Sequence, residues 1–467
     1  MASKRDQLHA YQFLVQRVIS ALVTRETDPE QPPFRRPVNA AFGGIAIAVI
    51  MLAAVGVYGV INPGGNQAWA DGKKVVEKET GTRYVYLDGR LHPVENYTSA
   101  LLALSDHAET VSVSRDSLAG VPRGPRIGIP DAPDALPGKD GLLQDGWTLC
   151  SQPAPDLTGT IVPTSVLMVG QSAQGGLALG DYAVLADVPE TGERYLLLRG
   201  YRHLISKPDQ LSVGLALRAT PAVRVSPAVI ESTPAGRPIA PIPVAQMGQP
   251  AQVVRPDIRA GQLFAVSTSR GVQFYLAEVG QLRPITELQY DIQRAYQATA
   301  LAYPNQEPRA LPMGLIEASG APQVGNAPAK PGDPPAVRPD FVRAEDAATL
   351  CLTFLDADVP LMTLAPLMPP VDPMSATPRR TPQGAVLADR VVVPAGHAAV
   401  VEAVPGPDAP RGTFLVVTDQ GIAYPLASVE VLKVLGYDGV TPVRMPSGLV
   451  ARVPMGSGLS HEAALQR

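Results

Sequence analysis

The chain has 467 residues and a net charge of −4, because 43 Asp and Glu outnumber 39 Lys and Arg. This balance excludes proteins that bind nucleic acid by neutralising phosphates, which carry an excess of basic residues. Hydrophobic residues make up 45% of the chain, and its 42 glycines and 49 prolines stay below the share typical of wholly disordered sequences, so the composition favours a loop-rich protein with β-structure and roughly three domains.

An amphipathic helix is the first predicted element, within an N-terminal segment of residues 1–39. Apolar residues recur between residues 7 and 23 at steps of three and four, which places them on one helical face. The residues of this face are Leu8, Tyr11, Leu14, Val15, Val18 and Leu22. Such a face requires a partner, either a membrane surface or another protein. The polar face has few Lys and Arg residues to meet lipid headgroups, which favours docking onto a partner subunit.

Residues 40–61 form an uncharged apolar run, and we predict that they are a transmembrane helix. About 20 helical residues span the hydrocarbon core of a bilayer. The long polar segment before the run does not resemble the short leader of a cleaved signal peptide, and a buried core helix is the remaining alternative. Arg35 and Arg36 precede the run, so the positive-inside rule predicts a single-pass protein with a cytoplasmic N-terminus and the bulk of the chain outside.

Four stretches of the outer region share one pattern: a short apolar strand with an aromatic residue, a turn with glycine, a second short strand and a helical stretch. The opening aromatic residues are Tyr84, Tyr195, Phe274 and Phe414, and the turn glycines are Gly89, Gly200, Gly280 and Gly421. Candidate extra strands precede three copies, at residues 182–187, 263–267 and 398–404.

These copies are predicted to be small ββα or βββα repeats at residues 73–117, 181–220, 260–300 and 390–440. Their unequal spacing excludes a regular solenoid or propeller. Because so short a unit cannot bury a core alone, each repeat is expected to pack on its neighbours.

Proline-dense stretches are predicted to be linkers around a central β-rich domain, which is made of residues 142–180 and 341–365. The linkers are residues 118–141 and 301–340, and residues 441–467 are predicted to be a C-terminal tail. Proline keeps such linkers stiff and extended.

The two cysteines, Cys150 and Cys351, lie in the two segments of this central domain. An even number of cysteines in an oxidising compartment indicates that the two form one disulfide, which would join the segments. Two unpaired buried thiols are the alternative. A zinc site is disfavoured, because neither cysteine belongs to a CxxC motif or lies near a cluster of histidines.

The N-terminal helix QLHAYQFLVQRVISALV, the single span, the four repeats and the two outer cysteines together resemble the EccB family. EccB is a core membrane component of the actinobacterial type VII (ESX) secretion machinery. The resemblance covers nearly the whole chain and implies a complex with EccC (the motor ATPase), EccD, EccE and further copies of the chain, in which EccB supplies periplasmic mass. It also implies repeats that flank a disulfide-closed central domain and that are similar to cell-wall-binding repeats of phage lysins.

Members of the family are sometimes labelled ATPases, but the sequence contains no catalytic motif. A P-loop requires G-x-x-x-x-G-K-[ST], and neither Gly-Lys pair, at Gly72 and Gly138, fits this pattern. The six histidines form no H-E-x-x-H motif, and the shared repeat position of His92 and His203 favours a packing or hydrogen-bonding role. We therefore predict no catalytic residues, no cofactor and no metal ligands.

The sequence thus predicts an α+β protein with a cytoplasmic amphipathic helix, one transmembrane helix and an extended outer domain of four ββα-type repeats around a central β-rich domain. Its predicted function is to scaffold the outer side of the ESX machinery in the inner membrane. Two alternatives remain, a membrane-anchored module that binds peptidoglycan and a nucleotide hydrolase without a standard motif. Binding to purified cell wall would indicate the first, and turnover of ATP the second.

Overall fold

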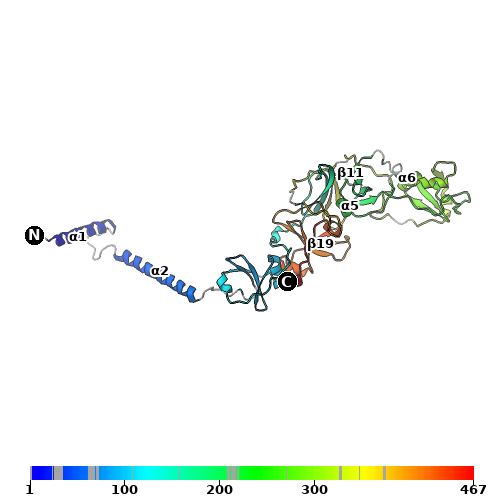
Figure 1. The fold of residues 1–467 in the computed structure, drawn as a ribbon. Helices are drawn as coiled ribbons and strands as arrows, with labels where there is room; N and C mark the ends of the chain where they lie inside the picture. The colour runs from blue at the N-terminus through cyan, green and yellow to red at the C-terminus, as the bar shows by residue number, and fades with distance from the viewer. Residues whose placement is uncertain are drawn as a thin grey trace. The chain divides into compact units, whose positions relative to one another are not determined.

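The computed structural model describes residues 3–23, 25, 35–61, 69, 73–107, 109–156, 158–207, 211, 217, 220–269, 271–325, 329–345, 348–371 and 375–466. The chain divides into two compact units, Met1–Pro93 with Ala108–Pro125, and Val94–His107 with Arg126–Arg467. Figure 1 shows N-terminal helices and, later in the chain, β-sheets with short helices, which is the mixed α+β class that the sequence predicts.

Two long helices begin the chain, α1 at Lys4–Val23 and α2 at Arg35–Ile61. Within α2, Val38–Val60 is apolar over 23 residues and none of its most apolar window is buried. It is the one helix in the described part of the chain that is long and apolar enough to cross a membrane. The predicted span is therefore present, and its helix begins at Arg35 rather than at residue 40.

Four of the sheets have four strands each. If the strands of each sheet are numbered along the chain, their order across the sheet is third, second, first, fourth in all four. The first three strands are antiparallel, and the fourth pairs in parallel with the first. We call these sheets repeats 1 to 4. Repeat 1 contains β1 (Lys74–Glu77), β2 (Arg83–Leu87), β3 (Arg90–Pro93) and β4 (Thr110–Val113). Repeat 2 contains β8 (Val184–Val188), β9 (Glu193–Leu198), β10 (Tyr201–Leu204) and β11 (Ala222–Arg224).

Repeats 3 and 4 have the same plan. Repeat 3 contains β12 (Leu263–Thr268), β13 (Gly271–Glu278), β14 (Gln281–Ile285) and β15 (Ala310–Pro312). Repeat 4 contains β19 (Ala398–Val404), β20 (Thr413–Thr418), β21 (Ala423–Pro425) and β22 (Val443–Pro446). Helices follow the third strand as α3 (Tyr97–Leu104), α6 (Glu287–Ala295) and α8 (Glu430–Val434), of which α3 belongs to the second unit.

The hairpin between the second and third strands forms where the turn glycines were predicted. Asp88 and Gly89 both have positive φ, 50° and 73°, and such a two-residue turn matches the twist of antiparallel strands. Gly200, Gly280 and Gly421 also have positive φ, a conformation that costs least at glycine. In repeat 3, Thr286 and Gln289 then cap the start of α6 reciprocally.

The fourth strand was not predicted, so repeats 1, 3 and 4 are βββαβ units rather than ββα or βββα. The helix predicted for repeat 2 lies largely outside the described residues. In repeats 2, 3 and 4 this strand lies beyond the predicted ends, inside the supposed linker 301–340 for β15 and inside the supposed tail 441–467 for β22. A strand of three or four residues is too short to show an alternating pattern, so its sequence carries little signal.

A short helix follows the fourth strand in every repeat. These helices are η2 (Arg115–Leu118), α5 (Pro227–Ser232), α7 (Leu315–Gly320) and α9 (Ser447–Val450). Other short helices in the described part of the chain are η3 (Lys139–Gly141), η5 (Gln297–Ala302) and α10 (His461–Ala464). The supposed linkers and tail therefore contain ordered elements.

The segment after each short helix covers the outer edge of the third strand. In repeat 4 the Ala423 N–H donates to the Pro454 carbonyl and the Gly456 N–H donates to the Ala423 carbonyl, both at 2.9 Å. Equivalent pairs of bonds join Leu91, Arg202 and Leu282 to the corresponding segments of repeats 1, 2 and 3. An open edge strand is a template for pairing with other chains, so each repeat protects this edge with its own chain.

The central sheet has six strands in the order β18-β6-β5-β16-β17-β7. The strands are β5 (Trp147–Pro155), β6 (Ile161–Met168), β7 (Leu177–Ala178), β16 (Leu350–Phe354), β17 (Leu361–Leu364) and β18 (Arg390–Val392). Because β18 is a strand of this sheet, the predicted start of repeat 4 at residue 390 is wrong, and the repeat's first strand begins at Ala398. Buried side chains of this sheet, such as Trp147 and Phe354, share one core with Leu197 of repeat 2 and Val417 of repeat 4.

Candidate functional site

The predicted disulfide lies at the centre of the six-stranded sheet. Cys150 of β5 and Cys351 of β16 face each other directly in the antiparallel register, with their Cα atoms 4.0 Å apart, and they form a disulfide that closes 201 residues of chain. Both side chains are buried beside Val166 and Met168. The disulfide prediction is confirmed, and the alternative of two unpaired thiols is excluded for both cysteines of the sequence.

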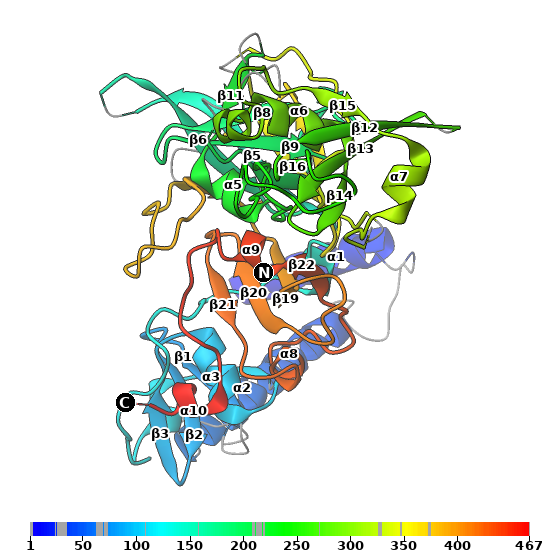
Figure 2. The same cartoon turned by 90° about the vertical axis from the view of Figure 1, so that its right-hand side faces the viewer.

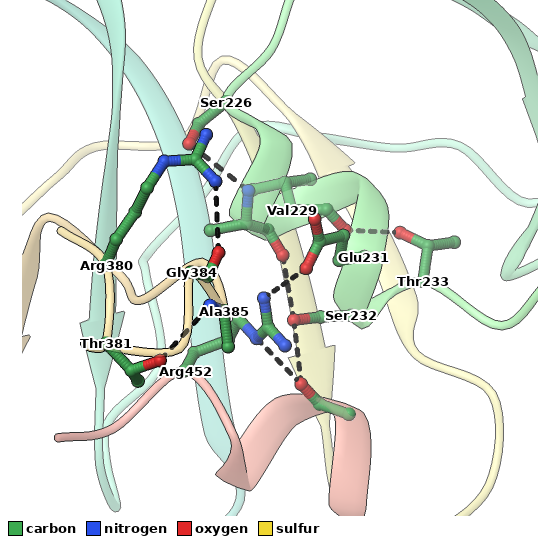
Figure 3. A network of polar contacts seen from close by, with 12 residues as sticks. Ser226, Val229, Glu231, Ser232, Thr233, Arg380, Thr381, Gly384, Ala385 and Arg452 are labelled. Atoms are coloured by element: carbon green, nitrogen blue, oxygen red, sulfur yellow. Dashed lines mark hydrogen bonds and ion pairs between the residues drawn. The ribbon is translucent and has the colours of Figure 1, made fainter. Parts of the chain in front are cut away.

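A polar network joins repeat 2 to repeat 4 (Figure 3). The guanidinium of Arg452, whose side chain is only 7% exposed, forms an ion pair with Glu231 at the end of α5 and donates from Nε to the Gly448 carbonyl at 3.0 Å. The Ser226 N–H, at the start of α5, donates to Ser151 Oγ of β5 at 3.0 Å. One short helix therefore connects the two repeats and the disulfide-bearing strand.

A second cluster of charges lies in a cavity of about 420 Å³ beside this network. Arg380 pairs with Glu190 at 3.1 Å, and Arg379 pairs with Asp389 at 3.1 Å. Asp389 also accepts hydrogen bonds from the Ser165 backbone N–H and Oγ at 2.7 and 2.6 Å. Both guanidiniums are thus paired with carboxylates, an arrangement that ties the 375–389 loop to β6 and to repeat 2.

A cavity of about 1120 Å³ lies between repeats 2 and 3. Its lining includes Tyr201, His203, Arg237, Arg283 and Lys330. His203 is buried, and its Nδ1–H donates to the Arg237 carbonyl at 2.9 Å. Burial lowers the pKa of His203, and the bond to the carbonyl opposes that effect. His92 makes the equivalent bond to Pro125 in repeat 1, so the hydrogen-bonding role predicted for both histidines is confirmed.

The predicted docking face of α1 has its side chains open to solvent. Val15 is half-buried. The other five residues of the face are exposed, namely Leu8, Tyr11, Leu14, Val18 and Leu22. Phe13, on another side of the helix, is exposed as well, and the centre of its ring lies 5.4 Å from the Arg17 guanidinium, a contact that was not predicted. A contiguous apolar patch of this kind marks an interface.

A Pro-x-Gly motif that was not predicted closes the edges of repeats 1, 2 and 4, at residues 122–124, 234–236 and 454–456. A ring lies against each glycine, since a Cβ added at Gly124 or Gly236 would overlap His92 or His203, and one added at Gly456 would overlap Tyr424. The recurrence of the motif behind each repeat was a signal that could have revealed it. In the described part of the chain, no three His, Cys, Asp or Glu side chains form a group that could hold a metal.

Comparison with known proteins identifies the family. The model of the family described as "Type VII secretion system ESX-1, transport TM domain B" (EccB) matches residues 1–467. The chain belongs to this family. The resemblance to EccB inferred from the sequence is thereby confirmed.

The EccB1 protein of Mycobacterium tuberculosis, named an ESX-1 secretion system ATPase, is similar to this EccB-family chain, with 30% identity over 311 residues. The match spans 64% of this chain and 62% of that relative, which is less than two thirds of the relative's length.

Two solved structures share the fold. The structure titled "an intact ESX-5 inner membrane complex" contains a chain with a TM-score of 0.58 at 21% identity, covering 100% of this chain and 95% of that one. The structure titled "EccB3 dimer from the ESX-3 core complex" gives 0.59 at 20% identity, covering 85% of this chain and 100% of that one. At this identity the likeness concerns the fold.

Proposed function

We propose that this EccB-family chain is a structural, membrane-anchored subunit of a type VII (ESX) secretion complex and that it scaffolds the outer side of the translocation machinery. The observation that carries the proposal is the family match over residues 1–467, in a chain that combines one apolar span with a large multi-sheet region. Repeats 2 and 4 share one core with the disulfide-closed central sheet, an arrangement that suits a rigid scaffold.

Nucleotide hydrolysis is not part of the proposal. The word ATPase stands in the names of relatives, but the sequence contains no G-x-x-x-x-G-K-[ST] loop to bind phosphates. The partners in the proposal are EccC, EccD, EccE and further copies of the chain.

The proposed topology has residues 1–39 in the cytoplasm, one crossing by α2, and the repeats with the central domain on the outer side of the inner membrane. Arg35 and Arg36 before the span support this orientation through the positive-inside rule, and the disulfide suits an oxidising compartment. Protease added to spheroplasts should remove a C-terminal tag and spare an N-terminal tag. A protected C-terminal tag would overturn this orientation.

The exposed face of α1 is proposed to dock onto another subunit of the complex. Leu14 and Val18 are both exposed and lie one turn apart, so aspartates there would place unpaired charges in any apolar contact. Each such charge costs several kcal/mol when it is buried, which abolishes a typical interface. Leu14→Asp with Val18→Asp should therefore stop assembly of the complex.

The matched control is His9→Asp with Gln16→Asp, which adds two carboxylates on the opposite face of the same helix, where both native side chains are exposed. Native gels of detergent-solubilised membranes should show the complex for the control and only free protein for the Leu14/Val18 variant. Normal assembly of the Leu14/Val18 variant would refute docking through this face.

A further inference from the structure

The sheet of repeat 1 has one covered edge and one open edge. Its strand order is β3-β2-β1-β4, and Figure 2 shows β1, β2 and β3 side by side. The chain itself covers the edge at β3, where the Leu91 N–H donates to the Pro122 carbonyl at 2.9 Å. At the other edge, β4 pairs in parallel with β1. No other strand of the described residues pairs with the outer side of β4.

Two residues of β4 direct their backbone groups away from the sheet. The Lys74 N–H of β1 donates to the Glu109 carbonyl at 3.2 Å, which sets the phase of the parallel ladder. Successive residues of a strand bond to opposite sides, so Val111 also bonds toward β1, whereas Thr110 and Ser112 face outward. In the part of the chain that the structure describes, the backbone N–H and C=O groups of these two residues form no hydrogen bond.

The other repeats protect the position of Ser112. Counted back ten residues from the proline whose carbonyl bonds to the third strand, the equivalent residues are Arg224, Pro312 and Arg444 in repeats 2, 3 and 4. Charged residues and proline are usual devices that keep edge strands from pairing, and proline also lacks the N–H. The strand Thr110–Val113 contains neither. The open edge is therefore a feature of the sequence of repeat 1 and not of the shared fold.

This edge is accessible and lies within reach of the membrane. The side chains of Thr110 and Ser112 are exposed. The first strand of the sheet begins at Lys74, thirteen residues after α2 ends at Ile61. Thirteen extended residues span at most about 45 Å, so a chain anchored by α2 keeps the start of this sheet within that distance of the membrane.

We propose that the outer edge of β4, residues Thr110–Val113, binds an extended segment of another membrane subunit of the secretion complex, which adds a fifth strand to repeat 1. The proposal rests on the proposed function as a subunit of that complex, and it names one contact and the kind of partner that makes it.

The chemistry of the edge selects this occupant. Backbone N–H and C=O groups in a row are matched by a second extended backbone, which is how a peptide adds a strand to an open sheet edge. Side chains beside Thr110 and Ser112 are expected to be uncharged, since hydroxyl-bearing and β-branched residues form favourable pairs across strands. The short connection to α2 favours a partner that is held in the same membrane over a soluble protein.

Photocrosslinking in native membranes tests the contact with the full chain. A photoreactive benzoylphenylalanine replaces Thr110, whose side chain is exposed and points away from the plane of the sheet. Irradiation should crosslink the chain to a membrane subunit that migrates with it on native gels, as identified by mass spectrometry. The matched control carries the same residue at Thr80, which is exposed in the turn between β1 and β2, and should crosslink at least tenfold less.

Four outcomes of this experiment would overturn the proposal. They are equal crosslinking at residues 110 and 80, no crosslinking at residue 110, crosslinking only to a second copy of the chain, and crosslinking only to a protein outside the membrane.

Ser112→Pro in the same photoreactive background removes an outward N–H and no hydrogen bond within the chain. Repeat 3 has Pro312 at this position, so the fold accepts proline there. Crosslinking should fall at least tenfold, and Ser112→Ala, which keeps the N–H, should leave it unchanged. Ser112→Arg, which copies Arg224 of repeat 2, should lower crosslinking to the same extent. An undiminished crosslink in the proline variant, with a native unfolding curve by circular dichroism, would refute pairing through this edge.

Native gels separate this proposal from the proposed function. If the chain migrates with the complex but does not crosslink at residue 110, the edge contact is refuted and the scaffold function stands. If the native chain migrates alone, the scaffold function is refuted together with the contact that rests on it.

Discussion

Arg452 of repeat 4 forms an ion pair with Glu231 of repeat 2, across 221 residues of chain (Figure 3). An arginine that is 7% exposed must have its charge satisfied, because a buried unpaired guanidinium is costly. Arg452 donates hydrogen bonds to two acceptors, the Glu231 carboxylate and the Gly448 carbonyl. The pair therefore holds two repeats together on the core that they share with the central sheet.

Arg452→Met should lower the free energy of unfolding by about 1.5–3 kcal/mol, the range for hydrogen bonds to a charged group. Glu231 is 43% exposed and will be solvated in the variant, which keeps the loss within this range. The matched control is Arg380→Met, whose pair with Glu190 is about half exposed on both sides and should contribute less than about 1 kcal/mol. Urea unfolding monitored by fluorescence measures both, and equal losses would contradict the structural role of Arg452.

Replacement of both cysteines, Cys150→Ala with Cys351→Ala, should lower the free energy of unfolding by about 2–5 kcal/mol. The disulfide closes 201 residues, so its loss frees a long loop in the unfolded chain. A reductant that opens the bond should lower the melting temperature of the native chain and leave that of the double variant unchanged. Membrane insertion should stay normal, since α2 does not depend on the bond. An identical melting temperature for the two chains would contradict this account.

The hairpins of the repeats could be predicted because their signals are local. An aromatic strand residue such as Tyr84, a turn glycine such as Gly89 and a closing proline such as Pro93 fall within ten residues, and turn chemistry acts at that range. The fourth strand could not be predicted in this way. β22 has four residues and becomes a strand only because β19, some forty residues earlier, offers its edge in parallel.

In the site, too, features with a simple sequence signal could be predicted, and contacts between distant segments could not. The cysteines could be paired from the sequence because the chain has only two of them. The Arg452–Glu231 pair could not, since one arginine among many and one glutamate 221 residues away share no pattern. The helix α7 was also hidden, because it lies within residues 301–340, which were predicted to be a proline-dense linker.

Gly456→Ala should destabilise repeat 4 by about 1–3 kcal/mol, the usual cost of overpacking a filled site. The added Cβ would overlap the ring of Tyr424, which is buried and cannot move aside without disturbing its neighbours. Gly325→Ala is the control, because it lies in the corresponding segment of repeat 3 and its Cβ would meet no atom within 4 Å. Thermal melting followed by circular dichroism should show a lower melting temperature for Gly456→Ala alone, and a similar decrease for both variants would contradict the ring contact.

Acidification should destabilise repeat 2 through His203. Burial lowers the pKa of this buried imidazole below its ordinary value of about 6.5, while Asp333 and the Arg237 carbonyl oppose the shift. As the pH falls through 6.5, the unfolded chain binds a proton that the folded chain does not yet bind, so the free energy of unfolding decreases. The decrease ends once the pH is below the folded pKa, where both states are protonated.

His203→Gln should remove this part of the pH dependence, because glutamine can still donate to the Arg237 carbonyl but does not titrate. Urea unfolding at pH 5, 6, 7 and 8 should give a shallower slope for this variant between pH 5 and 7 than for the native chain. His92→Gln is the matched control, because it makes the same substitution at the same position of repeat 1, where the histidine is only half-buried. A slope that changes in the control and not in the His203 variant would show that the acid sensitivity originates elsewhere.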